Sequence, residues 1–187
     1  MEPITVVVDR LPPEGEQYTV ELGAAELDRH FAAAGVPGVR GGGPLRARVR
    51  VLPSGRDVFV LGDLDATVQY ECVRCLTAFA GTVRAEFHLT YCREPEGVGG
   101  GELELHREDL DVERLAGNVL ELLPVLYEQL DLALDTHPVC REGCKGLCPR
   151  CGADRNRGEC RCGGAAVDPR FAALRDWAAK GSGSKER

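Results

Sequence analysis

Aromatic residues and long apolar runs are scarce in this sequence. Phe, Trp and Tyr together make up 5% of its 187 residues, so few side chains can stack on nucleic-acid bases. No apolar run approaches the roughly 20 residues that a helix needs to cross a bilayer. The first ten residues contain neither the basic segment nor the apolar segment of a secretory signal. We therefore expect a cytoplasmic protein that makes no contact with membranes.

The motifs of common catalytic sites are also missing. No HExxH, G-x-S-x-G or phosphate-binding glycine loop occurs, and the four histidines are scattered. His30 falls beside the apolar face of a predicted helix and His137 in a predicted loop, where solvated side chains are the simpler interpretation. His137 could still replace a cysteine as a metal ligand. We therefore expect a protein that is not an enzyme and has no small-molecule substrate.

Negative charge dominates the chain, but it is unevenly distributed. The formal net charge is −7, which argues against binding of nucleic acid by bulk electrostatics. Residues 1–139 carry 12 Lys and Arg against 24 Asp and Glu, whereas residues 140–187 carry 11 against 6. The basic part of the chain therefore coincides with the region in which the cysteines are concentrated.

The apolar pattern is typical of an α+β protein. Polar and apolar residues alternate along three stretches, which predicts an antiparallel β-meander over residues 45–92, and short strands are predicted at 4–8 and 18–22. We expect this β-meander domain to carry a few packed helices and a C-terminal Cys-rich zinc-knuckle module. The chain is predicted to begin with a β-rich N-terminal domain (1–107) and a helical connector (108–139). A zinc module (140–167), a C-terminal helix (168–180) and a flexible tail (181–187) follow.

Helical spacing of apolar residues appears in two regions. Residues 24–34 show it clearly, and residues 112–122 repeat it after Asp111, a suitable N-cap. Because proline is favoured at the first helical position, a further helix is predicted over 124–131. Residues 132–134 are interpreted as a short strand.

Three arginines lie on one face of the first strand of the meander. Arg46, Arg48 and Arg50 alternate with apolar residues, and such a stripe could follow a phosphate backbone. A solvated outer face is the favoured interpretation, because acidic residues dominate the neighbouring sequence. The glycine run at 41–43, followed by proline, is expected to interrupt the chain before this strand.

Six of the nine cysteines fall between Cys140 and Cys162, a density that a packed core does not explain. In a reducing compartment such clusters bind metal more often than they form disulfides. Cys148 and Cys151 are separated by two residues, so they can chelate one ion from a tight turn, and Gly152 can adopt the positive φ that such a turn needs. This stretch predicts a zinc knuckle.

A second CxxC pair, Cys72 and Cys75, lies at a predicted strand end. A thioredoxin-like redox pair would open a helix, whereas predicted strands lie on both sides of this pair. Half of a metal site is therefore favoured. Cys92 follows an aromatic residue in a strand, and we expect a half-buried thiol there rather than a ligand.

Eight cysteines suffice for two closed tetrahedral zinc sites of the structural type. The ligands expected for a local knuckle site are Cys148, Cys151, Cys160 and Cys162. The ligands expected for a second site, which would fasten the meander to the C-terminal module across a long loop, are Cys72, Cys75, Cys140 and Cys144. The alternative is one zinc ion held by Cys140, Cys144, Cys148 and Cys151, with the first CxxC pair as reduced thiols.

The motifs also follow a recognisable order along the chain. A CxRC at a strand end, a Leu-rich stretch, PVCxxxCKGLCPxCGxD, a CxC pair and a final DPRFxxL helix occur in succession. This order resembles the YceD family of large ribosomal RNA subunit accumulation proteins, over roughly residues 45–180. The resemblance implies a bacterial or plastid ribosome-biogenesis factor that is needed for normal levels of large-subunit ribosomal RNA.

Basic residues accompany the cysteines, and on a rigid scaffold they suit phosphate contacts on structured RNA, recognised by shape and backbone. The candidates for RNA binding are Arg141, Lys145, Arg150, Arg155, Arg157 and Arg161. The expected partner is large-subunit ribosomal RNA or a pre-ribosomal particle. Alternatively, the acidic N-terminal domain is an adaptor that recruits a ribosomal protein or a ribonuclease without RNA contact. A weaker hypothesis is a thiol sensor in which oxidation expels zinc.

Overall fold

The chain forms two compact units, Met1–Cys144 (unit 1) and Lys145–Arg187 (unit 2). The boundary between them lies inside the segment 140–167, which is predicted from the sequence to be one zinc module. The computed structural model describes residues 4–93, 112–115, 117–158, 160–162, 169–171, 174 and 177. Four features lie outside the described residues: the predicted N-cap Asp111, Asp168 at the start of the predicted C-terminal helix, His106 and the tail 181–187.

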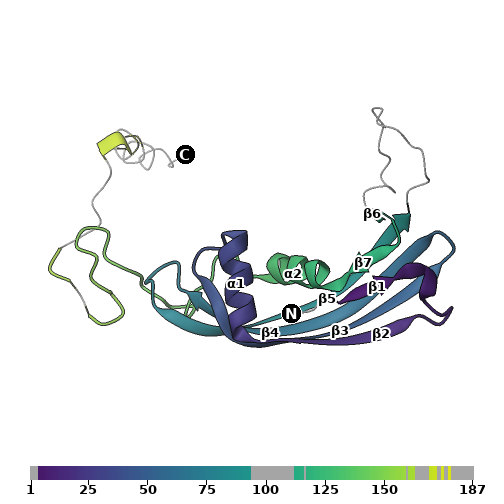
Figure 1. Ribbon diagram of the computed structural model, residues 1–187. Helices are drawn as coiled ribbons and strands as arrows, with labels where there is room; N and C mark the ends of the chain where they lie inside the picture. Colours follow the sequence, from purple (N-terminus) through teal and green to yellow (C-terminus); the bar gives the residue numbers. More distant parts are fainter. Residues whose placement is uncertain are drawn as a thin grey trace, which may run out of the picture. The chain divides into compact units, whose positions relative to one another are not determined.

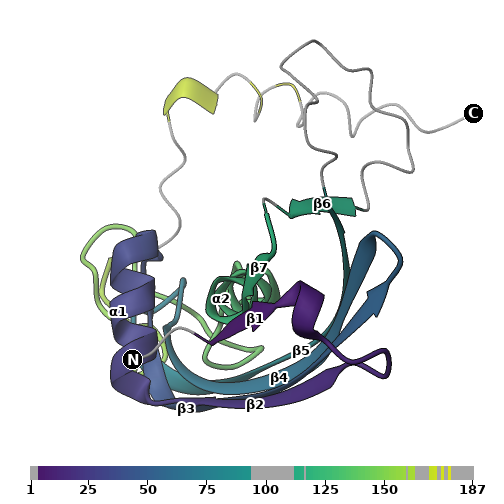
Figure 2. The same cartoon turned by 45° about the vertical axis from the view of Figure 1, so that its right-hand side comes forward.

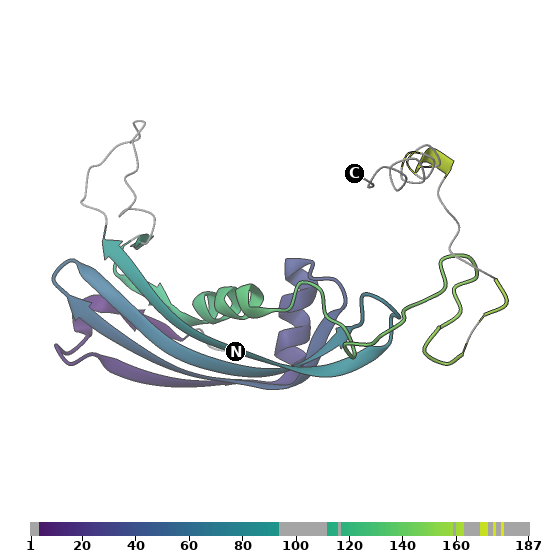
Figure 3. The ribbon, with the colours of Figure 1, turned by 180° about the vertical axis from the view of Figure 1, so that it is seen from behind.

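Unit 1 is built on a curved five-stranded sheet of order β2-β3-β4-β5-β6 (Figure 1). Neighbours from β2 to β5 pair antiparallel, whereas β6 pairs parallel with β5. The strands are β2 (Glu16–Leu22), β3 (Val39–Ser54), β4 (Asp57–Glu71), β5 (Ala78–Arg93) and β6 (Val112–Leu115). The long hairpins of β3, β4 and β5 (Figure 3) confirm the predicted antiparallel meander.

A two-stranded antiparallel sheet and two helices complete unit 1. The small sheet pairs β1 (Thr5–Val7) with β7 (Val119–Glu121), and β1 leads directly into the 3-10 turn η1 (Val8–Arg10). The helices α1 (Ala24–Ala34) and α2 (Leu122–Ala133) lie on the concave face of the large sheet, which curves around α2 (Figure 2). The fold is therefore α+β, with a mostly antiparallel sheet.

The core of unit 1 lies between this concave face and the two helices. Alternate residues of β3 and β4 are buried, and α1 and α2 add leucines together with Phe31. Such alternation follows from the two-residue period of a strand, which sends successive side chains to opposite faces. At positions 46, 48 and 50 of β3, where the side chains point away from the core, the residues are exposed arginines.

The β3 arginines are engaged on this outer face. Arg46 pairs with Glu21 at 3.4 Å and Arg48 with Asp63 at 3.1 Å. Ion pairs with neighbouring strands stabilise a sheet modestly and leave less positive charge for a phosphate backbone. The solvated-face interpretation therefore describes this stripe better than a nucleic-acid surface.

The predicted helix over 112–122 is wrong, because tertiary pairing takes these residues into β6 and β7. Gly117 (φ +82°) forms the turn between the two strands, a break that the apolar spacing alone did not reveal. The helix α2 begins at Leu122 rather than at Pro124, which is accommodated in the first turn, where a backbone N–H has no intrahelical partner. Residues 132–133 complete α2 and form no strand.

His30 is more than a solvated side chain. Its Nε2 atom lies 3.0 Å from both carboxylate oxygens of Asp131. Its ring stacks on Tyr127 with centroids 4.1 Å apart. His30 therefore links α1 to α2, a contact between residues 101 positions apart that no local pattern indicates.

The residues beyond Cys162 are described only in part. Pro169–Phe171 form the 3-10 turn η3, and Leu174 and Trp177 are helical. No helix among the described residues is long and apolar enough to span a membrane.

The glycine run at 41–43 does not interrupt the chain, contrary to expectation. It stays within β3, where the pairing with β4 shifts register between Gly41 and Leu45. A Cβ atom on Gly41 would lie 2.2 Å from the carbonyl oxygen of Ala24 at the start of α1. Glycine is therefore required at this position by the close approach of two backbones.

We predict that Gly41→Ala destabilises the protein by about 2 kcal/mol or more, because neither backbone can move aside without disturbing α1 or β3. The matched control is Gly23→Ala at the same end of α1, where the nearest atom to an added Cβ is a carboxylate oxygen 3.7 Å away. Urea unfolding of both variants measures the difference. Equal midpoints for the two variants would contradict the prediction.

Candidate metal centres

Two groups of four cysteines meet in the folded chain. Within each group, the four sulfur atoms all lie within 4.8 Å of one another. Site 1 belongs to unit 1 and consists of Cys72, Cys75, Cys140 and Cys144. Site 2 belongs to unit 2 and consists of Cys148, Cys151, Cys160 and Cys162. The structure thus brings together, within each unit, the same two sets that sequence spacing suggested.

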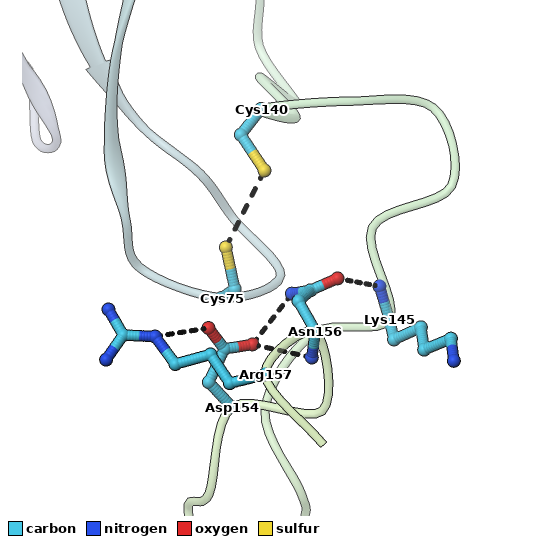
Figure 4. A network of polar contacts seen from close by, with 6 residues as sticks. All are labelled: Cys75, Cys140, Lys145, Asp154, Asn156 and Arg157. Carbon is cyan, nitrogen blue, oxygen red and sulfur yellow. Dashed lines mark hydrogen bonds and ion pairs between the residues drawn. The ribbon is translucent and has the colours of Figure 1, made fainter. Parts of the chain in front are cut away.

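The sulfur spacing in site 1 fits a tetrahedral metal ion. The Sγ atoms of Cys72 and Cys144 are 3.9 Å apart, and those of Cys75 and Cys140 are 3.7 Å apart (Figure 4). A tetrahedron with metal–sulfur bonds of about 2.3 Å has sulfur–sulfur edges of about 3.8 Å, whereas a disulfide bond measures about 2.05 Å. None of the nine cysteines, all of which are among the described residues, forms a disulfide, so this donor set could hold a metal ion.

Both CxxC turns have the same backbone hydrogen bonds. The carbonyl of the first cysteine accepts the N–H four residues later at 2.9 Å, from Leu76 in site 1 and from Gly152 in site 2. The N–H of the first cysteine donates to the carbonyl five residues later, at 3.0 Å for Cys72 and 2.8 Å for Cys148. The two CxxC turns, called knuckles below, are therefore equivalent in their backbone geometry.

The two knuckles differ at the residue after the second cysteine. Gly152 has φ +70°, and Leu76 has φ +60° and is the one described non-glycine residue with positive φ. Glycine adopts this conformation without strain, while a leucine there costs roughly 1–2 kcal/mol. The sequence indicated the knuckle at Gly152 directly, but at Leu76 only the cysteine spacing pointed to it.

Backbone donors favour a thiolate at the first cysteine of each knuckle. Burial of Cys72 opposes its ionisation, yet N–H groups of Cys140, Cys75 and Arg74 outweigh burial and lower its pKa to about 6. N–H groups of Cys151 and Arg150 lower the pKa of Cys148 to about 6 in the same way. Each site therefore provides one sulfur that ionises near neutral pH.

Other sulfurs in each site resist ionisation. Burial, followed by the neighbouring sulfurs, raises the pKa of Cys140 to about 12. The neighbouring Cys151 thiol, followed by burial, raises the pKa of Cys162 to about 12. Four adjacent sulfurs cannot all become thiolates without a compensating charge, and a divalent cation supplies that charge.

Arg74 holds the two halves of site 1 together. It lies between the cysteines of the knuckle, and its Nη1 atom donates to the carbonyls of Glu142 at 3.3 Å and of Cys144 at 3.1 Å. The backbone adds a bond from Val73 N–H to the Pro138 carbonyl at 3.0 Å. These contacts fix the 138–144 segment against the turn between β4 and β5, so the last two ligands of site 1 reach the first two.

An Asp–Asn pair shapes the loop of site 2 (Figure 4). The Oδ1 atom of Asp154 accepts hydrogen bonds from the backbone and side-chain nitrogens of Asn156 at 2.9 and 2.7 Å. Asn156 Oδ1 in turn accepts the N–H of Lys145 at 2.9 Å. Arg157 pairs with Asp154 at 3.5 Å. The chain between the two ligand pairs is thus folded back by short polar contacts.

The two sites differ in their surroundings. In site 1, Cys72, Cys75 and Cys144 are buried beside the core of unit 1. In site 2, Cys148 is buried, Cys151 is exposed, and the other two cysteines are half-buried. Among the described residues from 145 to 162, Gly146 and Cys148 alone are buried, so this segment has no hydrophobic core.

The remaining candidates take separate places. The six basic residues proposed for RNA binding are all exposed, with Arg141 in unit 1 and the other five in unit 2. Arg150 donates to the carbonyl of Cys162 at 2.9 Å, a contact that the sequence did not predict.

Cys92 lies in β5, half-buried and outside both sites, as expected. His137 is exposed and contacts Thr136, not a sulfur atom.

We predict that Arg74→Ala lowers the metal affinity of site 1 by about tenfold or more, because contacts that orient ligands have effects of this size. The readout is a zinc competition titration against a chromogenic chelator. Arg84→Ala on the outer face of β5 is the matched control and should leave the affinity unchanged. If the metal affinity of site 1 is unchanged in Arg74→Ala, the guanidinium group of Arg74 does not position the cysteines.

We also predict that metal removal affects the two units unequally. A chelator should make the chain cleavable by trypsin after Lys145, Arg155 and Arg157 within minutes, since the segment 145–162 lacks a core, while residues 4–93 remain protected. Mass spectrometry of the fragments with and without chelator measures this. Equal protection of the segment in both conditions would show that it folds without metal.

Comparison with known proteins assigns the chain to a family. The model of the large ribosomal RNA subunit accumulation protein YceD matches residues 60–177, which include both cysteine sites. An uncharacterized protein of Mycobacterium leprae is 29% identical over 111 residues, covering 59% of this chain and 49% of that protein. Uncharacterized proteins of Mycobacterium bovis and Mycobacterium tuberculosis are 31% identical over 104 residues, covering 56% of this chain and 48% of theirs.

This chain thus spans about half the length of the curated relatives that it matches. No solved structure matches it. The family model covers more than half of the chain and contains every cysteine of sites 1 and 2. On this basis the chain belongs to the YceD family, whose name links it to the accumulation of large-subunit ribosomal RNA.

Proposed function

We propose that this protein is a non-enzymatic ribosome-biogenesis factor of the bacterial cytoplasm, which binds large-subunit ribosomal RNA or a pre-ribosomal particle. The observation that supports this proposal most strongly is the placement of five exposed basic residues on the short, cysteine-held segment of unit 2. Family membership supplies the link to large-subunit ribosomal RNA. The proposed contact residues are Arg141, Lys145, Arg150, Arg155, Arg157 and Arg161.

Zn²⁺ is the proposed ion in both sites. Four thiolates in a tetrahedral arrangement favour zinc or an iron–sulfur cluster, and the CxxC knuckle is a common zinc-binding turn. A set of four cysteine ligands also closes the coordination sphere, so neither site offers an open position at which a metal-bound water could act as a nucleophile. The ions are therefore assigned a structural role, which agrees with a protein that is not an enzyme.

Charge on unit 2 suits contact with phosphate groups. Its described residues from 145 to 162 contain five basic side chains and one acidic side chain, Asp154. Asp154 already pairs with Arg157 and orders Asn156, so it neutralises little of the remaining positive charge. A zinc ion with four thiolates has a net charge of −2, which would lower the positive charge of this segment. Phosphate groups would then be bound by individual basic side chains rather than by a broad electrostatic attraction.

The chemistry of this surface favours recognition of RNA shape. The segment 145–162 contains no aromatic residue, and stacking on unpaired bases needs aromatic rings. Arginine instead donates paired hydrogen bonds to phosphate oxygens, and a rigid scaffold fixes the spacing between such contacts. The protein is thus proposed to bind folded segments of ribosomal RNA through the backbone.

An adaptor function is the second candidate, and the charge of unit 1 supports it. Residues 1–139 carry a twofold excess of acidic over basic residues, and Arg46 and Arg48 of β3 pair with acidic neighbours. A surface of this sign would attract a basic ribosomal protein or a ribonuclease rather than RNA. In this case the protein would affect ribosomal RNA only through the recruited partner.

Crosslinking in living cells distinguishes the two candidates. Ultraviolet light joins protein to RNA only at direct contacts, so sequencing of RNA attached to the purified protein maps them. Enrichment of defined positions in large-subunit ribosomal RNA would support direct binding. An absence of enrichment, together with copurification of a basic protein, would favour the adaptor.

We predict that the triple change Lys145→Glu, Arg155→Glu and Arg161→Glu weakens binding to a large-subunit ribosomal RNA fragment by about tenfold or more at moderate salt, with a shallower salt dependence. These three side chains are exposed, so the change leaves the described contacts of Asp154 and Arg150 intact. Filter binding over a salt series measures the effect.

The control for this prediction is Arg29→Glu, Arg40→Glu and Arg84→Glu, three exposed positions of unit 1 that give the same change in net charge. It should retain most of the RNA affinity. If both triple variants lose affinity equally, bulk charge rather than the unit 2 surface governs binding. If neither loses affinity, direct contact through these residues is wrong.

A further inference from the structure

Sites 1 and 2 have the same donors but different exposure to dissolved reagents. Three of the four site 1 cysteines are buried, with 0 to 7% of their surface exposed. Site 2 presents Cys151 to solvent and leaves Cys160 and Cys162 half-buried. Oxidants react with cysteines that are both accessible and ionised, and metal coordination keeps all four sulfurs ionised. Exposure therefore decides which of the two sites an oxidant reaches first.

A second sulfur lies ready to react with an oxidised Cys151. The Cys162 thiol interacts with the Cys151 thiol, and every sulfur pair in site 2 lies within 4.8 Å. The bond between Cys151 and Cys162 would form with a shift of roughly 2–3 Å toward disulfide length. Because no hydrophobic core restrains the described residues from 145 to 162, such a shift meets little resistance.

We propose that site 2 is a peroxide-sensitive modification site, at which oxidation of Cys151 and Cys162 to a disulfide releases the metal ion and unfolds the segment 145–162. Site 1 retains its ion under the same conditions. The consequence for RNA rests on the proposed function: the five basic side chains of unit 2 lose their common scaffold, and binding declines until a thiol reductant and zinc restore the site.

The chemistry balances with hydrogen peroxide as the oxidant. The Cys151 thiolate attacks one peroxide oxygen, an S–O bond forms, the O–O bond breaks, and the departing hydroxide takes a proton to become water. The Cys162 thiolate then attacks the sulfenic sulfur, an S–S bond forms, the S–O bond breaks, and a second hydroxide leaves as water. Two thiolates lose two electrons in total, and one peroxide with two protons gives two waters. Cys148 and Cys160 remain, too few to retain the ion.

The test begins with the full chain loaded with zinc at both sites. After addition of hydrogen peroxide, a chromogenic chelator follows zinc release, and differential alkylation with mass spectrometry identifies the oxidised cysteines. We expect one of two zinc equivalents to leave about tenfold faster than the other, and the disulfide to join Cys151 to Cys162. Equal release from both sites, oxidation that starts in site 1, or a site 2 that holds no zinc would overturn the proposal.

Two variants sharpen the test. Cys151→His keeps a zinc ligand but removes the exposed thiolate, so its zinc should be released about tenfold more slowly by peroxide. Cys92→Ser removes a cysteine outside both sites and should release zinc as the parent protein does. Release from Cys151→His at the parental rate would contradict the role of Cys151.

The RNA readout is kept separate from zinc release. If peroxide releases zinc from site 2 but the reduced protein never bound RNA, the redox inference stands and the proposed function fails. If the reduced protein binds RNA and peroxide releases no zinc from site 2, the proposed function stands and the redox inference fails. The two proposals therefore cannot fail by the same observation.

Discussion

The mutual repulsion of four thiolates is the constraint that the two cysteine sites, one in each unit, have in common. Each cysteine site holds its sulfurs within 4.8 Å of one another, a distance at which four thiolates cannot coexist without a cation. The N–H groups of the knuckles already favour a thiolate at Cys72 and Cys148. A bound divalent ion would balance the charge of the remaining thiolates.

The same donor set supports the two units in different ways. In unit 1, an apolar core of strands and helices exists independently of the cysteines, and site 1 with Arg74 fastens the segment after α2 to the end of the meander. In unit 2, site 2 stands in place of a core, since Cys148 and Gly146 are the buried residues of the described segment 145–162. If both sites hold an ion, its loss would loosen an attachment in unit 1 but would unfold the segment 145–162 in unit 2.

Local chemistry explains which features the sequence predicts. The meander and α1 follow from side-chain periodicity and from glycine at a helix end, which are properties of neighbouring residues. The helix expected over 112–122 fails because pairing with β5 and β1 decides the conformation there. The link between His30 and Asp131 and the left-handed Leu76 also depend on partners or strain that no spacing reveals. The cysteine groups were predictable because each CxxC spacing brings two sulfurs to one turn, and eight cysteines then suffice for two sites of four ligands.

The separation of ligands within site 1 sets an order of events during synthesis. Cys75 and Cys140 meet in space although 65 positions separate them, so at roughly 5–20 residues per second the first half of the site waits several seconds for the second. During that interval the β4–β5 hairpin carries two of the four cysteines, which would bind a metal ion only weakly. The site closes only after α2 has been made, and a chain that ends before Cys140 leaves the knuckle open. Any metal ion that site 1 holds would therefore be bound late, when unit 1 is complete.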